Sequence, residues 1–341
     1  MTTSAPAVTD AEIDAARTLL ARMGITPADL LDIRPTAPTF AQYIPVIRAR
    51  VAAPGTLKTY DTHWKRLERL WGTRRIDEPT VAEVAEMRDA ARHNAKCDRN
   101  SRDGRGAAEA MISALRFLYR HAESDGLIRP ADNPAQRVAK PRRVPSTRRG
   151  LPLTQLAEIT RVAATTGNDP ELDTLLLRLH SETACRRGGA LALRPADLDP
   201  QQCLIFLQEK GKISRWQPVS PTLMANLLHH GQTRGARSGE QLLRYRRGKP
   251  ITRRRYDGLW TRIGYELPWV EKQQITTHWI RHTTLTWVER NFGFAVARAY
   301  AGHAEGKSDG STTTYVRASL EEVALALATL TGEPHPLAAA A

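Results

Sequence analysis

A short basic stretch divides this sequence into two parts with different local patterns. Residues 137–149 contain six basic residues, no acidic residue and two prolines, Pro141 and Pro145. This composition favours an extended, solvated linker, because proline interrupts regular elements and like charges repel one another. A chain of 341 residues is long enough to form two domains. The sequence therefore predicts two folded units joined by this linker.

The part before residue 140 has helical patterns and none of the alternation that marks a strand. A short helical pattern covers Ala11 to Met23, and a longer helical unit begins at Thr39. Thr56 is a candidate N-cap for a helix in which large apolar side chains recur at helical spacing: Tyr60, Trp64, Leu67 and Trp71. Asp98 to Gly106 is polar and predicts a loop before a second amphipathic helix, Ala107 to Ala122. We expect the first unit to be all-helical.

The part after residue 150 combines helical patterns with two short β-rich runs. Cys203 to Gln208 and Ile213 to Val219 flank a Lys210–Lys212 turn, which predicts an antiparallel hairpin. The helical patterns cover Leu153 to Ala164, Leu172 to Ser181 and Ser319 to Leu330. The predicted fold class is mainly α: a helical domain followed by a mixed, α-rich domain with a small antiparallel β-sheet or hairpin.

The net charge favours a polyanionic partner. Lysine and arginine outnumber aspartate and glutamate by 50 to 36, which gives a formal net charge of +14 and suits nucleic acid. Cys97, Cys185 and Cys203 are odd in number and form no C-x-x-C pair, so neither a disulfide framework nor a thiolate zinc site is indicated. No secretory signal or membrane-length apolar stretch is present, so we expect a cytoplasmic protein.

Five segments of the second part carry side chains suited to phosphodiester chemistry. An arginine fork binds two non-bridging phosphate oxygens, and two forks on one phosphodiester would neutralise the charge that grows in its transition state. A histidine can accept the proton of a phenol, and a lysine can protonate the departing sugar oxygen. A tyrosine can then carry the phosphoryl group covalently. In chain order the candidates are Arg186, Lys210 with Lys212 as its competitor, His278, Arg281, His303 and Tyr315.

This order resembles that of the tyrosine recombinases, which are the phage integrases and chromosome-dimer resolvases. Arg186 stands at the position of the family's first catalytic arginine, and Lys210-Gly211 is similar to its hairpin lysine. His278-Trp-Ile-Arg281 matches the H-x-x-R box. Gly302-His303 is similar to the L-G-H box, and Tyr315 follows two threonines as the nucleophile often does. The resemblance covers roughly residues 151–330. Tyr300, the rival nucleophile, is expected inside a helix.

The first unit also resembles a domain of this family. The run from Phe117 to Ile128 and the pair Asn133-Pro134 are similar to the last helix and exit of its core-binding domain. The resemblance implies five parts in chain order: a short N-terminal helical extension at 1–35, a helical core-binding (SAM-like) DNA-binding domain at 36–138, a basic linker at 139–150, a catalytic domain at 151–334 and a tail at 335–341.

The resemblance implies a site-specific recombinase that cuts and rejoins duplex DNA through a 3′-phosphotyrosyl link at Tyr315. Arg186, Arg281 and His303 would hold the scissile phosphate, His278 would act as base, and Lys210 would protonate the leaving 5′ oxygen. The link conserves the bond energy, so no cofactor and no metal is expected. The implied assembly is a homotetramer on paired DNA sites, and accessory directionality or DNA-bending proteins fit the same picture. Integration, excision and resolution remain open alternatives.

Three departures from the family pattern affect the expected site. The family commonly carries an acidic residue three positions after its first arginine, where this chain has Gly189. That carboxylate normally braces the site, so the support of Arg186 is either lost or supplied from elsewhere. Ala184 replaces the commonest residue, glycine, two positions before Arg186. His303 and Tyr315 lie twelve residues apart, a longer spacing than the commonest one.

A second basic segment extends the predicted DNA contacts. Arg234 to Arg255 contains nine basic residues and one acidic residue, with Tyr245 among them. Gly248 to Thr252 is similar to a G-x-P-I/L-T segment of the resembled family. Charge runs often form only a solvated face, but this one could contact phosphates and read guanine. The predicted DNA-binding residues are Arg142, Arg143, Lys212, Arg246, Arg247, Arg253 and Arg254.

Other protein classes compete with this interpretation. A type IB topoisomerase uses nearly the same residues but reseals the same strand, and a non-catalytic DNA-binding regulator would need the charge without Tyr315. A DNA-metabolising metalloenzyme is the third alternative, because His278 and His282 have the spacing of a zinc pair. A zinc protease would need glutamate at position 279, where this chain has Trp279.

Overall fold

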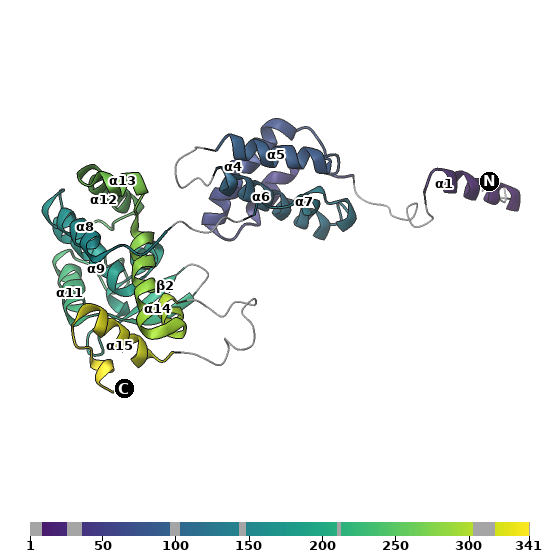
Figure 1. Ribbon diagram of the computed structural model, residues 1–341. Coiled ribbons are helices and arrows are strands. Elements are labelled where there is room, and N and C mark those ends of the chain that lie inside the picture. The colour runs from purple at the N-terminus through teal and green to yellow at the C-terminus, as the bar shows by residue number, and fades with distance from the viewer. Residues whose placement is uncertain are drawn as a thin grey trace. The chain divides into compact units, whose positions relative to one another are not determined.

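The computed structural model describes residues 9–25, 36–95, 103–142, 148–209, 213–302 and 318–340. The chain divides into two compact units, Met1–Val144 and Pro145–Ala341, and each is described by itself (Figure 1). No helix in these ranges combines the length and the apolar character that crossing a membrane requires.

The first unit is helical throughout its described residues, as the sequence predicts. Thr56 was a wrong choice of N-cap, because the helix that carries Trp64 begins at Pro54, where proline occupies the first turn and loses no hydrogen bond. The helix predicted from Ala107 begins at Arg105, after the left-handed Gly104. The helices are α1 (Asp10–Arg22), α3 (Phe40–Ala49), α4 (Pro54–Trp71), α5 (Val81–His93), α6 (Arg105–Ser124) and α7 (Pro134–Arg137).

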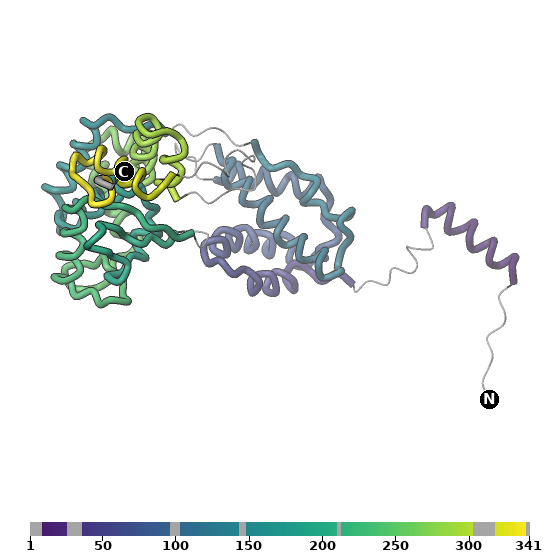
Figure 2. Tube along the Cα trace, turned by 90° about the horizontal axis from the view of Figure 1, so that it is seen from below, coloured from purple at the N-terminus to yellow at the C-terminus, as the bar shows by residue number. Residues whose placement is uncertain are grey.

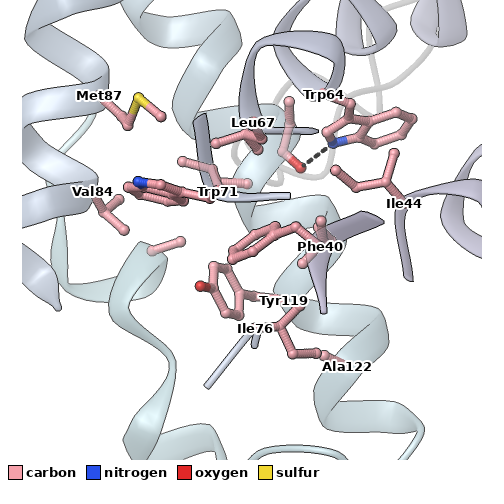
Figure 3. Packing of buried hydrophobic residues seen from close by; sticks show 14 of the residues in the cluster. Phe40, Ile44, Trp64, Leu67, Trp71, Ile76, Val84, Met87, Tyr119 and Ala122 are labelled. Carbon is pink, nitrogen blue, oxygen red and sulfur yellow. Dashed lines mark hydrogen bonds between the residues drawn. The ribbon is translucent and has the colours of Figure 1, made fainter. Parts of the chain in front are cut away.

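Aromatic side chains form the centre of this unit. Trp64 and Trp71 of α4 are buried together with Phe40 of α3 and Tyr119 of α6 (Figure 3). The ring centroids of Phe40 and Trp71 are 5.5 Å apart. Trp64 donates its indole N–H to the carbonyl of Ala114 at 3.2 Å, which satisfies the polar end of a fully buried ring. The apolar residues that recur at helical spacing along α4 therefore form the stripe of the helix that faces the core.

The second unit contains the predicted hairpin and one more strand. β2 (Leu204–Glu209) and β3 (Ile213–Pro218) pair antiparallel, with Phe206 opposite Trp216. Each strand lies within one residue of its predicted bounds. A two-residue strand, β1 (Leu198–Asp199), pairs with the other edge of β2 and was not predicted. The fold is thus mainly helical with a small antiparallel sheet, which confirms the predicted class.

Helices α10 and α15 pack against this sheet, and α9 has a central place among the helices of the unit. In Figure 1 it lies between α8 and α11, and it also packs against α14. Burial of most of its residues on several sides explains why its leucines fall into two different hydrophobic clusters. The helices are α8 (Leu153–Thr165), α9 (Pro170–Thr183), α10 (Arg187–Ala192), α11 (Pro221–Thr233), α12 (Arg253–Glu266), α13 (Pro268–Gln273), α14 (Thr277–Ala301) and α15 (Leu320–Thr331).

The C-terminal residues pack onto the second unit. Figure 2 shows α15 and the short helix η4 (Pro336–Ala340) in yellow against its other elements. Val323 and Leu327 of α15 are buried with residues of α14. The carboxylate of Glu333 pairs with Arg178 of α9 at 2.5 Å, and His335 Nε2 lies 3.2 Å from the carbonyl oxygen of Cys203. Helix α15 is therefore anchored along its buried face and beyond its C-terminal end.

Candidate active site

Arg186 lies at a corner between two helices. Helix α9 ends at Thr183, and its C-cap Ala184 is left-handed, with a φ of 48°. The chain then turns into α10, with Arg186 as the N-cap. The left-handed backbone explains why glycine would suit position 184, because a Cβ costs free energy in that conformation. About a third of the Arg186 side chain, 34%, is exposed, so its guanidinium can reach a bound ligand.

Glu209, the last residue of β2, holds Arg186 with both carboxylate oxygens. Oε1 accepts the backbone N–H of Arg186 at 2.5 Å, and Oε2 accepts Nη1 of its guanidinium, also at 2.5 Å. The Glu209 side chain is fully buried, at 0% exposure, and also accepts a bond from Arg215 of β3 at 3.1 Å. Burial alone would raise the pKa of Glu209, but the Arg186 N–H and the charges of the surrounding arginines lower it. Glu209 is therefore an ionised, internal carboxylate.

Arg281 reaches the same corner from α14. Its side chain is 4% exposed and donates to the carbonyl of Ala184, two residues before Arg186, and to the carbonyl of Ala301 at 2.8 Å. Desolvation and the charge of Arg186 lower its pKa from 12.5 to about 10. No carboxylate in the described ranges forms an ion pair with Arg281, so its direct partners there are carbonyl oxygens, and the charge of Glu209 acts on it without direct contact. The structure thus brings together the two arginines that the sequence singled out.

His278 lies in the first turn of α14, one turn before Arg281. Trp260 fixes this turn by donating its indole N–H to Thr277 Oγ1 at 2.8 Å. The His278 side chain is exposed. Partial desolvation lowers its pKa below 6.5, and the charges of Arg148 and Arg281 lower it further. The imidazole is therefore neutral at pH 7, the form that accepts a proton.

Lys210, Lys212, His303 and Tyr315 lie outside the described residues, but the residues that precede Lys210 and His303 are described. Lys210 directly follows Glu209, and His303 follows Gly302, the left-handed residue that ends α14 with φ of 60°. A Cβ at Gly302 would overlap the guanidinium of Arg215.

The rival nucleophile Tyr300 is unavailable. It is fully buried inside α14 and donates its hydroxyl to the Glu182 carbonyl. Burial raises the pKa of Tyr300, so its hydroxyl neither reaches a ligand nor ionises readily.

The predicted DNA-binding arginines are exposed where the structure describes them: Arg142, Arg246, Arg247, Arg253 and Arg254. Arg143 lies outside the described residues, as does Lys212. Arg253 and Arg254 belong to the first turn of α12, near the Arg186 corner, because Asp257 of the next turn pairs with Arg187 at 3.2 Å.

Not every charge of the second basic segment faces outward. Arg234 and Arg255 are buried and pair with Asp169 and Asp173 at 2.5 and 2.6 Å. These arginines hold the start of α9 to the end of α11 and the start of α12, so only the exposed part of the run can contact DNA.

Sequence reasoning missed Glu209 and Arg215 as members of the site. Together with Arg186 and Arg281 they place three guanidinium groups around a single carboxylate. The resulting excess of positive charge at a partly open corner suits one phosphate group. The available sequence signal was an acidic residue directly after a predicted strand and before Lys210, and it does not show that the side chain is buried.

The zinc alternative gains no support from His278 and His282. His282 Nδ1 lies 3.0 Å from Thr286 Oγ1 of its own helix. Across the described segments, no group of three or more His, Cys, Asp or Glu side chains is arranged to hold a metal ion.

Known proteins are similar to this chain in sequence and in fold. A model of the phage integrase family matches residues 151–322. Tyrosine recombinase XerC of Chlamydia trachomatis serovar L2 is 29% identical over 225 residues, which cover 62% of this chain and 66% of that protein. XerC of Chlamydia caviae is also 29% identical, over 154 residues that cover 44% of this chain and 48% of that protein.

Two solved structures have a similar fold at low sequence identity. A lambda integrase tetramer bound to a Holliday junction has a TM-score of 0.59 and 15% identity, covering 92% of this chain and 88% of that one. The Tn1549 transposon integrase in complex with circular intermediate DNA has a TM-score of 0.61 and 17% identity, covering 83% and 96%. Because the family model spans half of the sequence, the chain belongs to the phage integrase family, the tyrosine recombinases.

Proposed function

We propose that this protein is a site-specific DNA recombinase that cleaves and rejoins duplex DNA through a covalent link to Tyr315. The observation that carries the proposal is the convergence of Arg186 and Arg281. They come from segments 95 residues apart in sequence, yet Arg281 donates to the carbonyl of Ala184 beside Arg186. Two guanidinium groups at one open corner suit a single phosphodiester.

The proposed reaction assigns one role to each candidate. Arg186, Arg281 and His303 hold the scissile phosphate, and the Tyr315 hydroxyl attacks its phosphorus while His278 takes the phenolic proton. The bond to the 5′ oxygen breaks, and Lys210 supplies the proton that this oxygen gains. The 5′ hydroxyl of a partner strand then attacks the phosphotyrosyl link, and the phenol regains its proton. Neither ATP nor a metal enters the balance.

The five-part division and the assembly belong to the same proposal. Residues 36–138 would bind DNA as a core-binding domain, and residues 151–334 would form the catalytic domain. The protein would act on DNA in the cytoplasm. The similar lambda integrase structure is a tetramer on a Holliday junction, which supports a tetramer of this chain on paired sites. Two rounds of strand exchange, with two strands cut in each round, would then pass through a four-way junction.

A nicked suicide duplex tests the proposal. Duplexes from the genomic neighbourhood of the gene trap the covalent link, because the short 5′ fragment diffuses away and cannot religate. We expect a protein–DNA adduct on a denaturing gel that peptide mapping places at Tyr315. Tyr315→Phe should abolish it, and Tyr265→Phe, which alters an exposed tyrosine of the same unit, should not.

Two outcomes would overturn the proposal. If Tyr315→Phe leaves every DNA activity unchanged, the protein is a binding regulator. If the protein relaxes a supercoiled plasmid that lacks any recombination site, resealing of the same strand describes it better, as in a type IB topoisomerase.

A further inference from the structure

Position 189 has a defined place in the helix that Arg186 begins. Arg186 is the N-cap of α10, and Gly189 is the third residue of that helix. An acidic side chain at this third position commonly reaches back to accept the N–H of the N-cap residue, which forms half of a capping box. Glycine has no side chain for this bond, so the Arg186 N–H needs another acceptor.

Glu209 supplies that acceptor from the sheet. Its Oε1 accepts the Arg186 N–H, the bond that an acid at position 189 would make, while Oε2 holds the guanidinium. A Cβ built on Gly189 would lie 3.1 Å from Cγ of Glu209 and 3.4 Å from its Oε1. Glu209 therefore fills the space into which a side chain at 189 would point, and the two positions compete for it.

We propose that Glu209 is the positioning residue that orients Arg186 on the scissile phosphate, and that Gly189 is required to leave room for it. The inference rests on the proposed function, because it names the part that holds one of the phosphate ligands. Among the described residues only Nη1 of the Arg186 guanidinium is engaged, so the remaining N–H groups stay available to a phosphate. A fork that is fixed at one nitrogen loses less freedom when it binds an anion.

Glu209 also connects two further arginines to the site. Its Oε2 accepts Nη1 of Arg215, and its charge offsets part of the repulsion between Arg186 and Arg281. Without this carboxylate, three guanidinium groups would share a largely buried corner without an internal counter-charge. Removal of Glu209 should therefore disturb the geometry of the arginines more than it disturbs contact with DNA elsewhere on the protein.

The inference is tested in the full-length protein by moving the carboxylate from position 209 to position 189. The variants are Glu209→Ala, Gly189→Asp and the double variant that carries both. Glu266→Ala, at an exposed carboxylate of α12, is the control. Adduct formation on a suicide duplex is measured in a single turnover, and DNA affinity is measured by gel shift.

We expect Glu209→Ala to slow adduct formation by about 10- to 100-fold, the scale of a misplaced catalytic group, with little change in DNA affinity. Gly189→Asp alone should slow adduct formation as well, because its carboxylate meets that of Glu209. The double variant should recover most of the rate that Glu209→Ala loses. A double variant no faster than Glu209→Ala, or a Glu209→Ala variant as fast as the control, overturns the proposal.

Urea unfolding of the same variants separates this inference from the proposed function. If the two side chains share one space, the loss of stability caused by Gly189→Asp disappears when Glu209 is shortened, and the two changes are not additive. Additive losses would contradict the shared space whether or not the wild type forms an adduct. If the wild type forms no adduct but the losses of stability are not additive, the proposed function is overturned. The inference that Glu209 and position 189 share one space is then still supported.

Discussion

At the scale of single residues, the neighbours of His278 determine when it can act as a base. Partial desolvation and the charges of Arg148 and Arg281 lower its pKa, so the neutral form persists to a pH below 6.5. Adduct formation should therefore stay level from pH 8 to about 6.5 and decline only as the pH falls through the lowered pKa. Single-turnover rates across this range measure it. His278→Gln should remove the acidic decline, and an unchanged decline in that variant would exclude His278 as the base.

At the residue scale, Lys210 and Lys212 are also expected to have different effects on cleavage. Lys210 follows Glu209, which is fixed to Arg186, whereas Lys212 precedes Ile213 on the other strand. We expect Lys210→Ala to reduce adduct formation by about 100-fold or more, the usual contribution of a general acid, while DNA affinity stays nearly constant. Lys212→Ala should change the rate far less. Suicide-duplex cleavage by both variants compares them, and a reversed order of effects would reassign the acid to Lys212.

At the scale of elements, the first turn of α12 carries charge of the unfavourable sign. It contains Arg253, Arg254 and Arg255 and no acidic residue, although a helix N-terminus repels cations. Arg255 is compensated by Asp173, but Arg253 and Arg254 are exposed. Such an arrangement becomes favourable when a phosphate backbone lies against the turn.

The double variant Arg253→Ala/Arg254→Ala should therefore weaken DNA binding without lowering stability. We expect unfolding free energy to be unchanged or raised by about 0.3–1 kcal/mol, the range of a helix-dipole contribution. Gel shifts and urea unfolding measure the two effects. Arg161→Ala/Arg290→Ala removes equal charge from exposed sites on α8 and α14. Equal weakening by both pairs would point to net charge and not to α12.

The elements that sequence patterns predicted well are those with one buried face. The stripe of α4 and the two long strands were found within a few residues, because periodicity reports a single core-facing side. Helix α14 is different: residues on several of its sides are buried, and the chain kinks at Gly293, where φ is 82°. Its local pattern therefore gave the H-x-x-R box and a helical position for Tyr300, but not the bounds of the helix.

The site residues that could be predicted from the sequence are likewise those that local patterns identify. Arg186 and Arg281 could be named because their local boxes resemble those of a known family. Glu209 could not, because its role depends on the missing side chain at Gly189, twenty residues earlier in the chain. Only the packing of α10 against β2 shows that Gly189 and Glu209 lie next to each other.

At the scale of the whole molecule, the net charge of +14 should dominate DNA affinity. Each neutralised phosphate releases counterions, so the logarithm of the binding constant should fall by about 0.9 per phosphate contact for each logarithmic unit of salt. For a protein with several contacts the loss is on the order of a thousandfold between 50 and 200 mM salt. Gel shifts or fluorescence anisotropy across this range measure the slope. A flat dependence would contradict extensive phosphate contact by the two units.

The place of Glu209 beside Lys210 has a kinetic consequence. Glu209, the proposed positioning residue, is the last residue of β2, and Lys210, the proposed general acid, is the next residue in the sequence. Any displacement of that strand end would withdraw the acid and release the fork in the same movement. The protomer would then lose its ability to cleave DNA in a single step. It would pass through no half-assembled state that nicks DNA and fails to complete the exchange.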